Sequence, residues 1–224
     1  MFLYIYMAFF NPEASLVIRR GKLPHWRQEG AIYFVTFHLA DSLPQTKLEW
    51  LRQEKDLWLR LNPEPHTDSQ RREYHERFTQ TVNRWLDAGY GRCILARPDC
   101  RAVMEASLLH FDGVRYDLGR FVVMPNHVHA IVAPISEHQL SQILHTWKSF
   151  TAHQFSRVLA LGGRIWHRES FDHIVRSAEH LAKFEAYIRN NPEEVVSKAG
   201  TLRGKAKRGR FAYGAEQSGT LRLP

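Results

Sequence analysis

Residues 114–133, with the sequence VRYDLGRFVVMPNHVHAIVA, decide the fold of this chain. Residues 114–124 and 127–133 are rich in apolar and β-branched side chains, and the Pro125-Asn126 pair between them is typical of a tight turn. The pattern predicts two antiparallel strands joined as a hairpin. His127 and His129 are two residues apart in the second strand, so their side chains are expected on one face of the sheet.

Strands and helices alternate on both sides of this hairpin. The apolar stretch 31–39, AIYFVTFHL, predicts a buried strand. Ser136 and Gln139 have the spacing of a capping box, Ser177 is expected to cap the last helix, and Pro192 to help end it. The other expected elements are two helices within 47–88 that are interrupted at 62–65, a helix at 98–110, a helix from 140 to about 161, a strand at 171–175 and a helix from 178 to about 190.

This order predicts an α+β fold, a ferredoxin-like βαββαβ antiparallel sheet with helices on one face. A helical insertion of about 45–95 follows the first strand, and a further helix ends the domain. We expect one domain over 1–200 and a flexible basic tail over 201–224, because residues 198–210 hold six basic residues and no acidic one.

Charge and cysteine content narrow the class of protein. The chain has 224 residues and a formal net charge of +8, which favours a polyanionic partner, nucleic acid before an anionic membrane. Its two cysteines, Cys93 and Cys100, form no CxxC motif, so a reducing cytoplasm is expected. The apolar start, 1–12, is too short to span a bilayer and is expected to be an edge strand, an irregular start, or a segment before a true start at Met7.

Two short patterns could carry chemistry. His127 and His129 could bind one metal ion together, although an HxH pair is also compatible with two polar residues on a solvated face. Tyr187 and Asn191 are four residues apart, so a helix places them on one face. On its own, Tyr187 beside an apolar stripe is typical of a packing residue.

Taken together, the patterns resemble a known family. MPNHVH at 124–129 followed by YIRNNP at 187–192 is similar to the single-tyrosine HUH transposases of the smallest insertion sequences, and most closely to the REP-associated tyrosine transposases. The similarity runs from about Arg20 to Leu202. It includes LPHWRQEGAIYFVTFHLADSLP, RWLDAGYGRCIL, ILHTWKSFTAH, IWHRESFDHIVRSAEHL and AYIRNNPEEVVSKAGTL.

The resemblance implies an HUH endonuclease fold and a set of site residues. Tyr187 would be the nucleophile, and His127, His129 and Asn191 would hold a divalent metal ion, Mg or Mn. The implied reaction cleaves and rejoins single-stranded DNA next to REP-like hairpins through a 5′-phosphotyrosine, with a monomer favoured and a homodimer possible. Basic residues expected to contact DNA are Arg19, Arg20, Lys22, Lys148, Arg176, Lys205, Lys207, Arg208 and Arg210.

Two other interpretations stay open at this point. One is a domesticated protein that binds hairpin DNA without cutting it. The other is a different metal-dependent hydrolase, in which His138 or His145 completes the HxH site and Tyr187 has no catalytic role.

Overall fold

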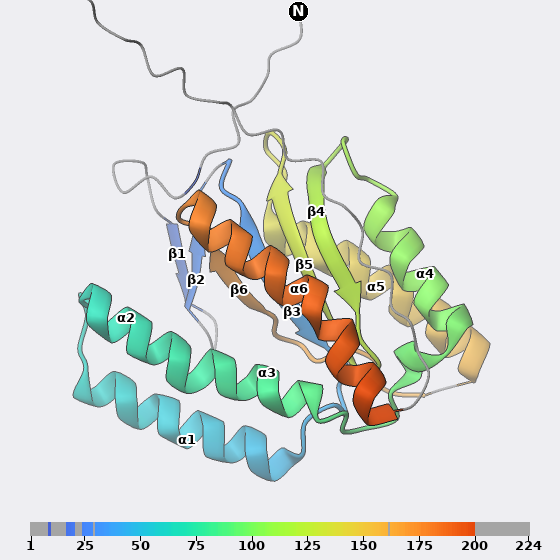
Figure 1. Ribbon diagram of the computed structural model, residues 1–224, viewed down its shortest axis with the longest axis horizontal. Helices are drawn as coiled ribbons and strands as arrows, with labels where there is room; N and C mark the ends of the chain where they lie inside the picture. Colours follow the sequence, from blue (N-terminus) through green and yellow to red (C-terminus); the bar gives the residue numbers. More distant parts are fainter. Residues whose placement is uncertain (1–8, 10–16, 21–23, 29, 161, 200–224) are drawn as a thin grey trace, which may run out of the picture.

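The computed structural model describes residues 9, 17–20, 24–28, 30–160 and 162–199 (Figure 1). The chain forms a sheet that carries helices on both faces, with a separate layer of helices along one end of the molecule (Figure 1). Its elements are β1 (Val17–Arg20), β2 (Pro24–Arg27), β3 (Tyr33–His38), α1 (Gln45–Leu61), α2 (Asp68–Tyr74), a π-helical turn (His75–Thr79), α3 (Gln80–Asp87), a 3-10 turn (Ile94–Ala96), α4 (Pro98–Leu109), β4 (Tyr116–Val123), β5 (His127–Pro134), α5 (Leu140–Leu159), β6 (Phe171–Ile174) and α6 (Ala178–Ala199).

The main sheet has four antiparallel strands in the order β4-β5-β3-β6. The hairpin predicted from residues 114–133 is the β4–β5 pair, and β5 also pairs with β3 along six residues. With the crossovers through α4 and α5, this is the βαββαβ arrangement, so the predicted α+β fold class is confirmed. The strands β3 and β5 form the centre of the sheet. Each has a paired strand on either side and is buried on both faces.

The two faces of the sheet are covered by different helices. The helices α4 and α5 cover one face and enclose the larger core, in which Trp147 is fully buried and donates its indole N–H to the Tyr116 hydroxyl at 2.9 Å. The helix α6 covers the other face, where Leu181, Phe184 and Ile188 pack on the sheet (Figure 1). The tyrosine-bearing helix therefore lies opposite the two crossover helices.

The segment from α1 to α3, between β3 and α4, forms its own helical layer. The helices α1 and α3 pack around Trp58, Phe78 and Leu86 in a third apolar cluster. The Lys55 ammonium lies 5.3 Å from the centre of the Phe171 ring, which connects this layer to β6. Burial lowers the pKa of Lys55 to about 8.

Two sequence predictions need correction, and one pair of strands was not predicted. The capping box of α5 is formed by Gln139 and Gln142, because the helix begins only at Leu140 and Ser136 adopts a positive φ of 53° in the preceding turn. Pro192 does not end α6, which continues to Ala199. The strands β1 and β2 form an antiparallel pair before β3 that the sequence did not predict.

One helix-capping prediction is confirmed, and the predictions for the two ends of the chain fall largely outside the described residues. Ser177 caps α6 as predicted, since its hydroxyl accepts the His180 backbone N–H at 3.2 Å. The predicted tail, 201–224, and nearly all of the apolar start lie outside the described residues. In the described part of the chain, no helix has the length and hydrophobicity needed to cross a membrane.

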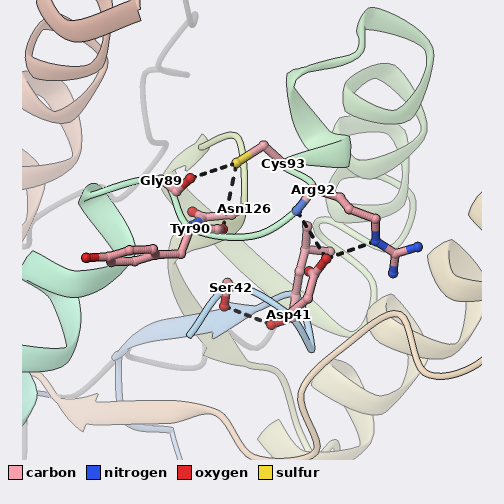
Figure 2. Close-up of polar contacts among 8 residues, drawn as sticks. Asp41, Ser42, Gly89, Tyr90, Arg92, Cys93 and Asn126 are labelled. Atoms are coloured by element: carbon pink, nitrogen blue, oxygen red, sulfur yellow. Dashed lines mark hydrogen bonds and ion pairs between the residues drawn. The ribbon is translucent and has the colours of Figure 1, made fainter. Parts of the chain in front are cut away.

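The turn that follows α3 is fastened to the loop after β3 (Figure 2). The Asp41 carboxylate accepts hydrogen bonds from the Arg92 backbone N–H at 3.1 Å and from Arg92 Nε at 2.9 Å. Burial raises the pKa of Asp41, but the hydrogen bonds and charge of Arg92 outweigh it and leave that pKa below its ordinary value. Gly91, at φ +88°, passes so close that a Cβ there would lie 2.5 Å from the Asp41 carbonyl oxygen. The turn therefore has little freedom to shift.

We expect Gly91→Ala to lower the free energy of unfolding by about 2–3 kcal/mol, because it adds a steric clash to an unfavourable positive φ. Gly89→Ala is the matched control, since Gly89 also has a positive φ, +74°, but no atom within 4 Å of an added Cβ. It should cost only about 1 kcal/mol. Urea denaturation of both variants measures the difference, and equal losses would show that the contact with Asp41 does not constrain the turn.

Candidate active site

The two histidines of the HxH pair lie on the central strand β5, on the sheet face that α6 covers. Both side chains are fully buried. Their Nε2 atoms are 3.0 Å apart, and the rings meet almost at right angles, at 80°. The alternation of a β-strand thus brings the two imidazoles together, and the solvated-face interpretation of this pair is wrong.

Each imidazole is oriented by a side chain that forms a hydrogen bond with its Nδ1 atom. Asn126 Oδ1 lies 2.7 Å from His127 Nδ1, and Thr36 Oγ1 lies 2.8 Å from His129 Nδ1. The Phe34 ring stacks on His129 at a centroid distance of 5.4 Å. These contacts orient both Nε2 atoms toward the same point, which is the arrangement that metal-binding histidines require.

Burial keeps both imidazoles uncharged. It lowers the pKa of His129 to about 3. Burial, and then the neighbouring His129, lower the pKa of His127 well below its ordinary value. Neutral imidazole is the form that donates a lone pair to a metal ion.

Asp87 is a third member of this site that sequence reasoning missed. Its Oδ1 lies 3.6 Å from His127 Nε2, and ligand atoms of Asp87, His127 and His129 all lie within 4.8 Å of one another. Asp87 is the last residue of α3, in the helical layer. No local pattern marks it, because forty positions of sequence separate it from His127 and only the packing of α3 against the turn before β5 brings it there.

Tyr187 reaches the same site from α6. Its hydroxyl lies 3.5 Å from His129 Nε2, and the two rings are 5.1 Å apart in an edge-to-face arrangement. The helix is fixed by its apolar side chains and by an ion pair at 3.6 Å between Glu185 and Arg120 of β4. The half-buried phenol therefore lies beside the histidine pair.

Asn191 lies one turn further along α6. It is buried, with 4% of its surface exposed, and its Nδ2 has no hydrogen-bond partner among the described residues. A polar side chain buried in this way on the tyrosine-bearing helix is compatible with a ligand role. That role stays a prediction.

A further buried histidine, His38, shares this sheet face but is turned elsewhere. It pairs with His127 across the β3–β5 register, yet its Nδ1 lies 2.7 Å from Ser42 Oγ and its ring stacks on His167 at 4.5 Å. Burial, and then His167, lower the pKa of His38 to about 3. Among the described residues, the metal-ligand cluster contains Asp87, His127 and His129 but not His38.

The two histidines considered as alternative ligands lie elsewhere. His138 and His145 line a separate surface pocket beside α5, with Arg115 and Gln142. Neither belongs to the cluster with His127 and His129. The interpretation in which they complete the HxH site is therefore wrong.

The predicted DNA contacts are spread over the chain. Arg19 and Arg20 lie in β1, and Arg176 is exposed just before α6. Lys22, Lys205, Lys207, Arg208 and Arg210 lie outside the described residues. The structure gives Lys148 an internal role, because its ammonium donates to the carbonyl oxygens of His167, Arg168 and Glu169 and to Ser170 Oγ, at 2.8–3.3 Å.

Two histidines from the segment before α6 contact different aromatic rings. His173 lies against Phe184 under α6 at 6.3 Å, whereas His167 packs on His38. Trp147 and Trp166 are core residues with 1% and 5% of their surface exposed, so they are not stacking platforms for bases.

Comparisons with solved structures give distant similarities. One is the structure of a REP-associated tyrosine transposase bound to a REP hairpin, at 17% identity and a TM-score of 0.39, over 82% of this chain and 76% of that chain. Another is a protein from Deinococcus radiodurans R1 described as a transposase, at 14% identity and a TM-score of 0.29, over 71% of this chain and 89% of that chain. A comparison with curated protein sequences found no match.

The family comparison gives a sharper result. Residues 103–191 match the family described as "Transposase IS200 like". The matched segment runs from α4 into α6 and includes His127, His129, Tyr187 and Asn191, whereas Asp87 lies before it. Residues 103–191 are therefore similar to the IS200-like transposases, a family of DNA-processing enzymes.

Proposed function

We propose that this protein is a metal-dependent transposase that cleaves and rejoins single-stranded DNA next to REP-like hairpins through a 5′-phosphotyrosine. The observation that carries the proposal is the position of the Tyr187 hydroxyl, 3.5 Å from His129 Nε2 and beside a second imidazole. A nucleophile and a metal-ligand set within one buried site are the two components that this chemistry needs.

The residues present fit a divalent metal ion. His127 and His129 offer two neutral nitrogens that converge, and Asp87 offers a carboxylate oxygen near them. We propose these three residues as ligands, with Asn191 as a further one. When bound, the ion would neutralise a non-bridging oxygen of the scissile phosphate and favour the ionised phenol. Imidazole and carboxylate together suit Mn²⁺ well, and Mg²⁺ is the other candidate.

Tyr187 would attack the scissile phosphorus with its phenolic oxygen. A bond forms between that oxygen and phosphorus, and the bond from phosphorus to the 3′ oxygen breaks. The phenolic proton passes to water, and the departing 3′ oxygen takes up a proton to become a hydroxyl. Attack of a 3′-hydroxyl on the phosphotyrosine reverses these steps, so rejoining the strand needs no nucleotide cofactor.

A DNA hairpin with a single-stranded flank is the proposed substrate. The net charge of +8 favours a polyanion, and one tyrosine per site cuts one strand at a time. We exclude Lys148 from the predicted DNA contacts, because its ammonium already donates to four acceptors within the protein. We retain Arg19, Arg20, Lys22, Arg176 and the basic residues after position 204. We propose a monomer as the active form, with a homodimer as the alternative.

We expect Tyr187→Phe to abolish formation of a covalent protein–DNA adduct, because the variant lacks the attacking oxygen. The measurement is a denaturing gel of the protein incubated with Mn²⁺ and labelled hairpin oligonucleotides, drawn from inverted repeats near the gene. Hairpin binding, followed by fluorescence anisotropy, should stay within about twofold of the wild type, since the ring and its packing remain.

Tyr90→Phe is the matched control for the tyrosine substitution. Its hydroxyl contacts Lys47 on the surface, 3.2 Å away, and it should form the adduct normally. An adduct with Tyr187→Phe would overturn the assignment of the nucleophile. A wild-type protein that binds these hairpins equally well with or without a chelator, and never forms an adduct, would instead be the non-catalytic hairpin binder.

We expect Asp87→Asn to weaken Mn²⁺ binding by about tenfold or more, because it removes a ligand charge at nearly constant shape. Isothermal titration calorimetry of the full chain measures the affinity directly. His129→Gln should weaken it further, and Asn191→Ala tests whether the amide also binds the metal.

Asp99→Asn is the control for the metal experiment. Asp99 is an exposed carboxylate that pairs with Arg97 at 2.8 Å on α4, so its loss should not change the affinity for Mn²⁺. Binding of wild-type strength in both Asp87→Asn and His129→Gln would show that the cluster is not the metal site.

A further inference from the structure

Asn126, the residue before the HxH pair, is more than part of a turn. Its side chain is buried, with 1% of the residue exposed, and it makes three hydrogen bonds to groups from two parts of the chain. Its amide nitrogen donates to the carbonyl oxygens of Leu86 and Tyr90, at 3.1 and 3.0 Å. Its amide oxygen faces His127 Nδ1 at 2.7 Å. Figure 2 shows Asn126 against the turn that contains Gly89 and Tyr90.

These bonds determine the protonation pattern of His127. Because the amide nitrogen is used by two carbonyls, the amide must present its oxygen to the histidine, and an amide oxygen only accepts. His127 therefore carries its proton on Nδ1 and keeps the Nε2 lone pair for the site. His129 differs, because its Nδ1 partner is the Thr36 hydroxyl from the sheet itself.

The same side chain also fixes the end of α3. Leu86 precedes Asp87 in α3, and its carbonyl also accepts the Gly89 backbone N–H at 3.0 Å, whereas Tyr90 lies in the turn that follows the helix. Asn126 supplies a donor to both carbonyls. The Asp87 carboxylate is thereby held beside His127, although it belongs to the helical layer and not to the sheet.

We propose that Asn126 is a positioning residue that couples the helical layer to the metal site, by fixing the Nδ1–H form of His127 and by holding Asp87 against it. This inference rests on the proposed metal site. It makes α1–α3 part of the active site. The segment that matches the transposase family begins only at residue 103, so the carboxylate comes from a part of the chain that the family match does not include.

The variant Asn126→Asp separates the two roles. It keeps an oxygen acceptor for His127 Nδ1–H but has no donor for the carbonyls of Leu86 and Tyr90, so Asp87 should lose its position. We expect about a tenfold weaker affinity for Mn²⁺ by calorimetry on the full chain. Because Asn126 would act through Asp87, the double variant with Asp87→Asn should be no weaker than Asp87→Asn alone.

The tautomer of His127 can be measured directly, and a purely structural role of Asn126 would not change it. In long-range ¹H–¹⁵N spectra of the metal-free protein, His127 should show the Nδ1–H form in the wild type and in Asn126→Asp. Asn126→Leu removes the acceptor and should produce a mixture of the two tautomers. If Asn126→Leu does not fold, Asn126→Ser provides the second variant, since its shorter side chain can accept from His127 but cannot bridge both carbonyls. It should weaken Mn²⁺ binding as Asn126→Asp does.

Asn62→Asp is the matched control. Asn62 also bridges two segments, donating to the Trp58 carbonyl at 2.9 Å and accepting from Gln70 Nε2 at 2.9 Å, but it lies between α1 and α2, whereas Asp87 ends α3. Its substitution should lower stability and leave the affinity for Mn²⁺ unchanged. Wild-type affinity in Asn126→Asp, or effects of Asn126→Asp and Asp87→Asn that simply add, would overturn the inference.

The test is independent of DNA cleavage. A chain that forms no adduct on Tyr187 would contradict the proposed reaction, yet the dependence of metal affinity on Asn126 would still hold. Conversely, normal cleavage with an Asn126→Asp variant of unchanged affinity would contradict only the coupling.

Discussion

The pairing of β3 with β5 at the centre of the sheet is the constraint on which the site depends. It places Thr36 opposite His129 and His38 opposite His127, on strands whose two faces are both covered. An imidazole that is fully buried there can be neither charged nor left without hydrogen-bond partners at low cost. His127 and His129 each have such a polar partner at Nδ1. That hydrogen bond fixes the orientation of the ring and directs its Nε2 atom toward the other histidine.

The two faces of the sheet differ: one encloses the larger apolar core, and the other carries the candidate site. On the face of α4 and α5, polar atoms are few and are satisfied internally, as in the chain of hydrogen bonds from Trp147 to Tyr116 and on to the Leu108 carbonyl. On the other face, α6 packs its apolar side chains on the sheet and presents Tyr187, which lies between Phe184 and Ile188, to the histidines. The core thus supports a site that faces the helix bearing Tyr187.

Sequence reasoning succeeded where the information is periodic or local. The alternation along residues 127–133 predicted that both histidines share a face, and the spacing of four between Tyr187 and Asn191 placed both on α6. It failed where tertiary structure decides. Ser136 has the residue type of a helix cap, but the chain takes a positive φ there, and Gln139 caps the helix instead. Asp87 has no local signature, because its role depends on how α3 packs on the turn at Asn126.

The charge of the ligand set is what Asp87 changes. Two imidazoles and an amide are neutral and would leave a divalent ion its full charge, which is the set that the sequence predicted. A carboxylate beside them would reduce the net charge of the occupied site to about +1 and would bind the ion more tightly. The lower net charge would also weaken the electrostatic attraction for the scissile phosphate and for an ionising Tyr187. Because Asp87 belongs to α3, the proposed balance between holding the metal and activating the phosphate would be set by a helical layer outside the sheet, and Asn126 is the side chain that connects that layer to His127.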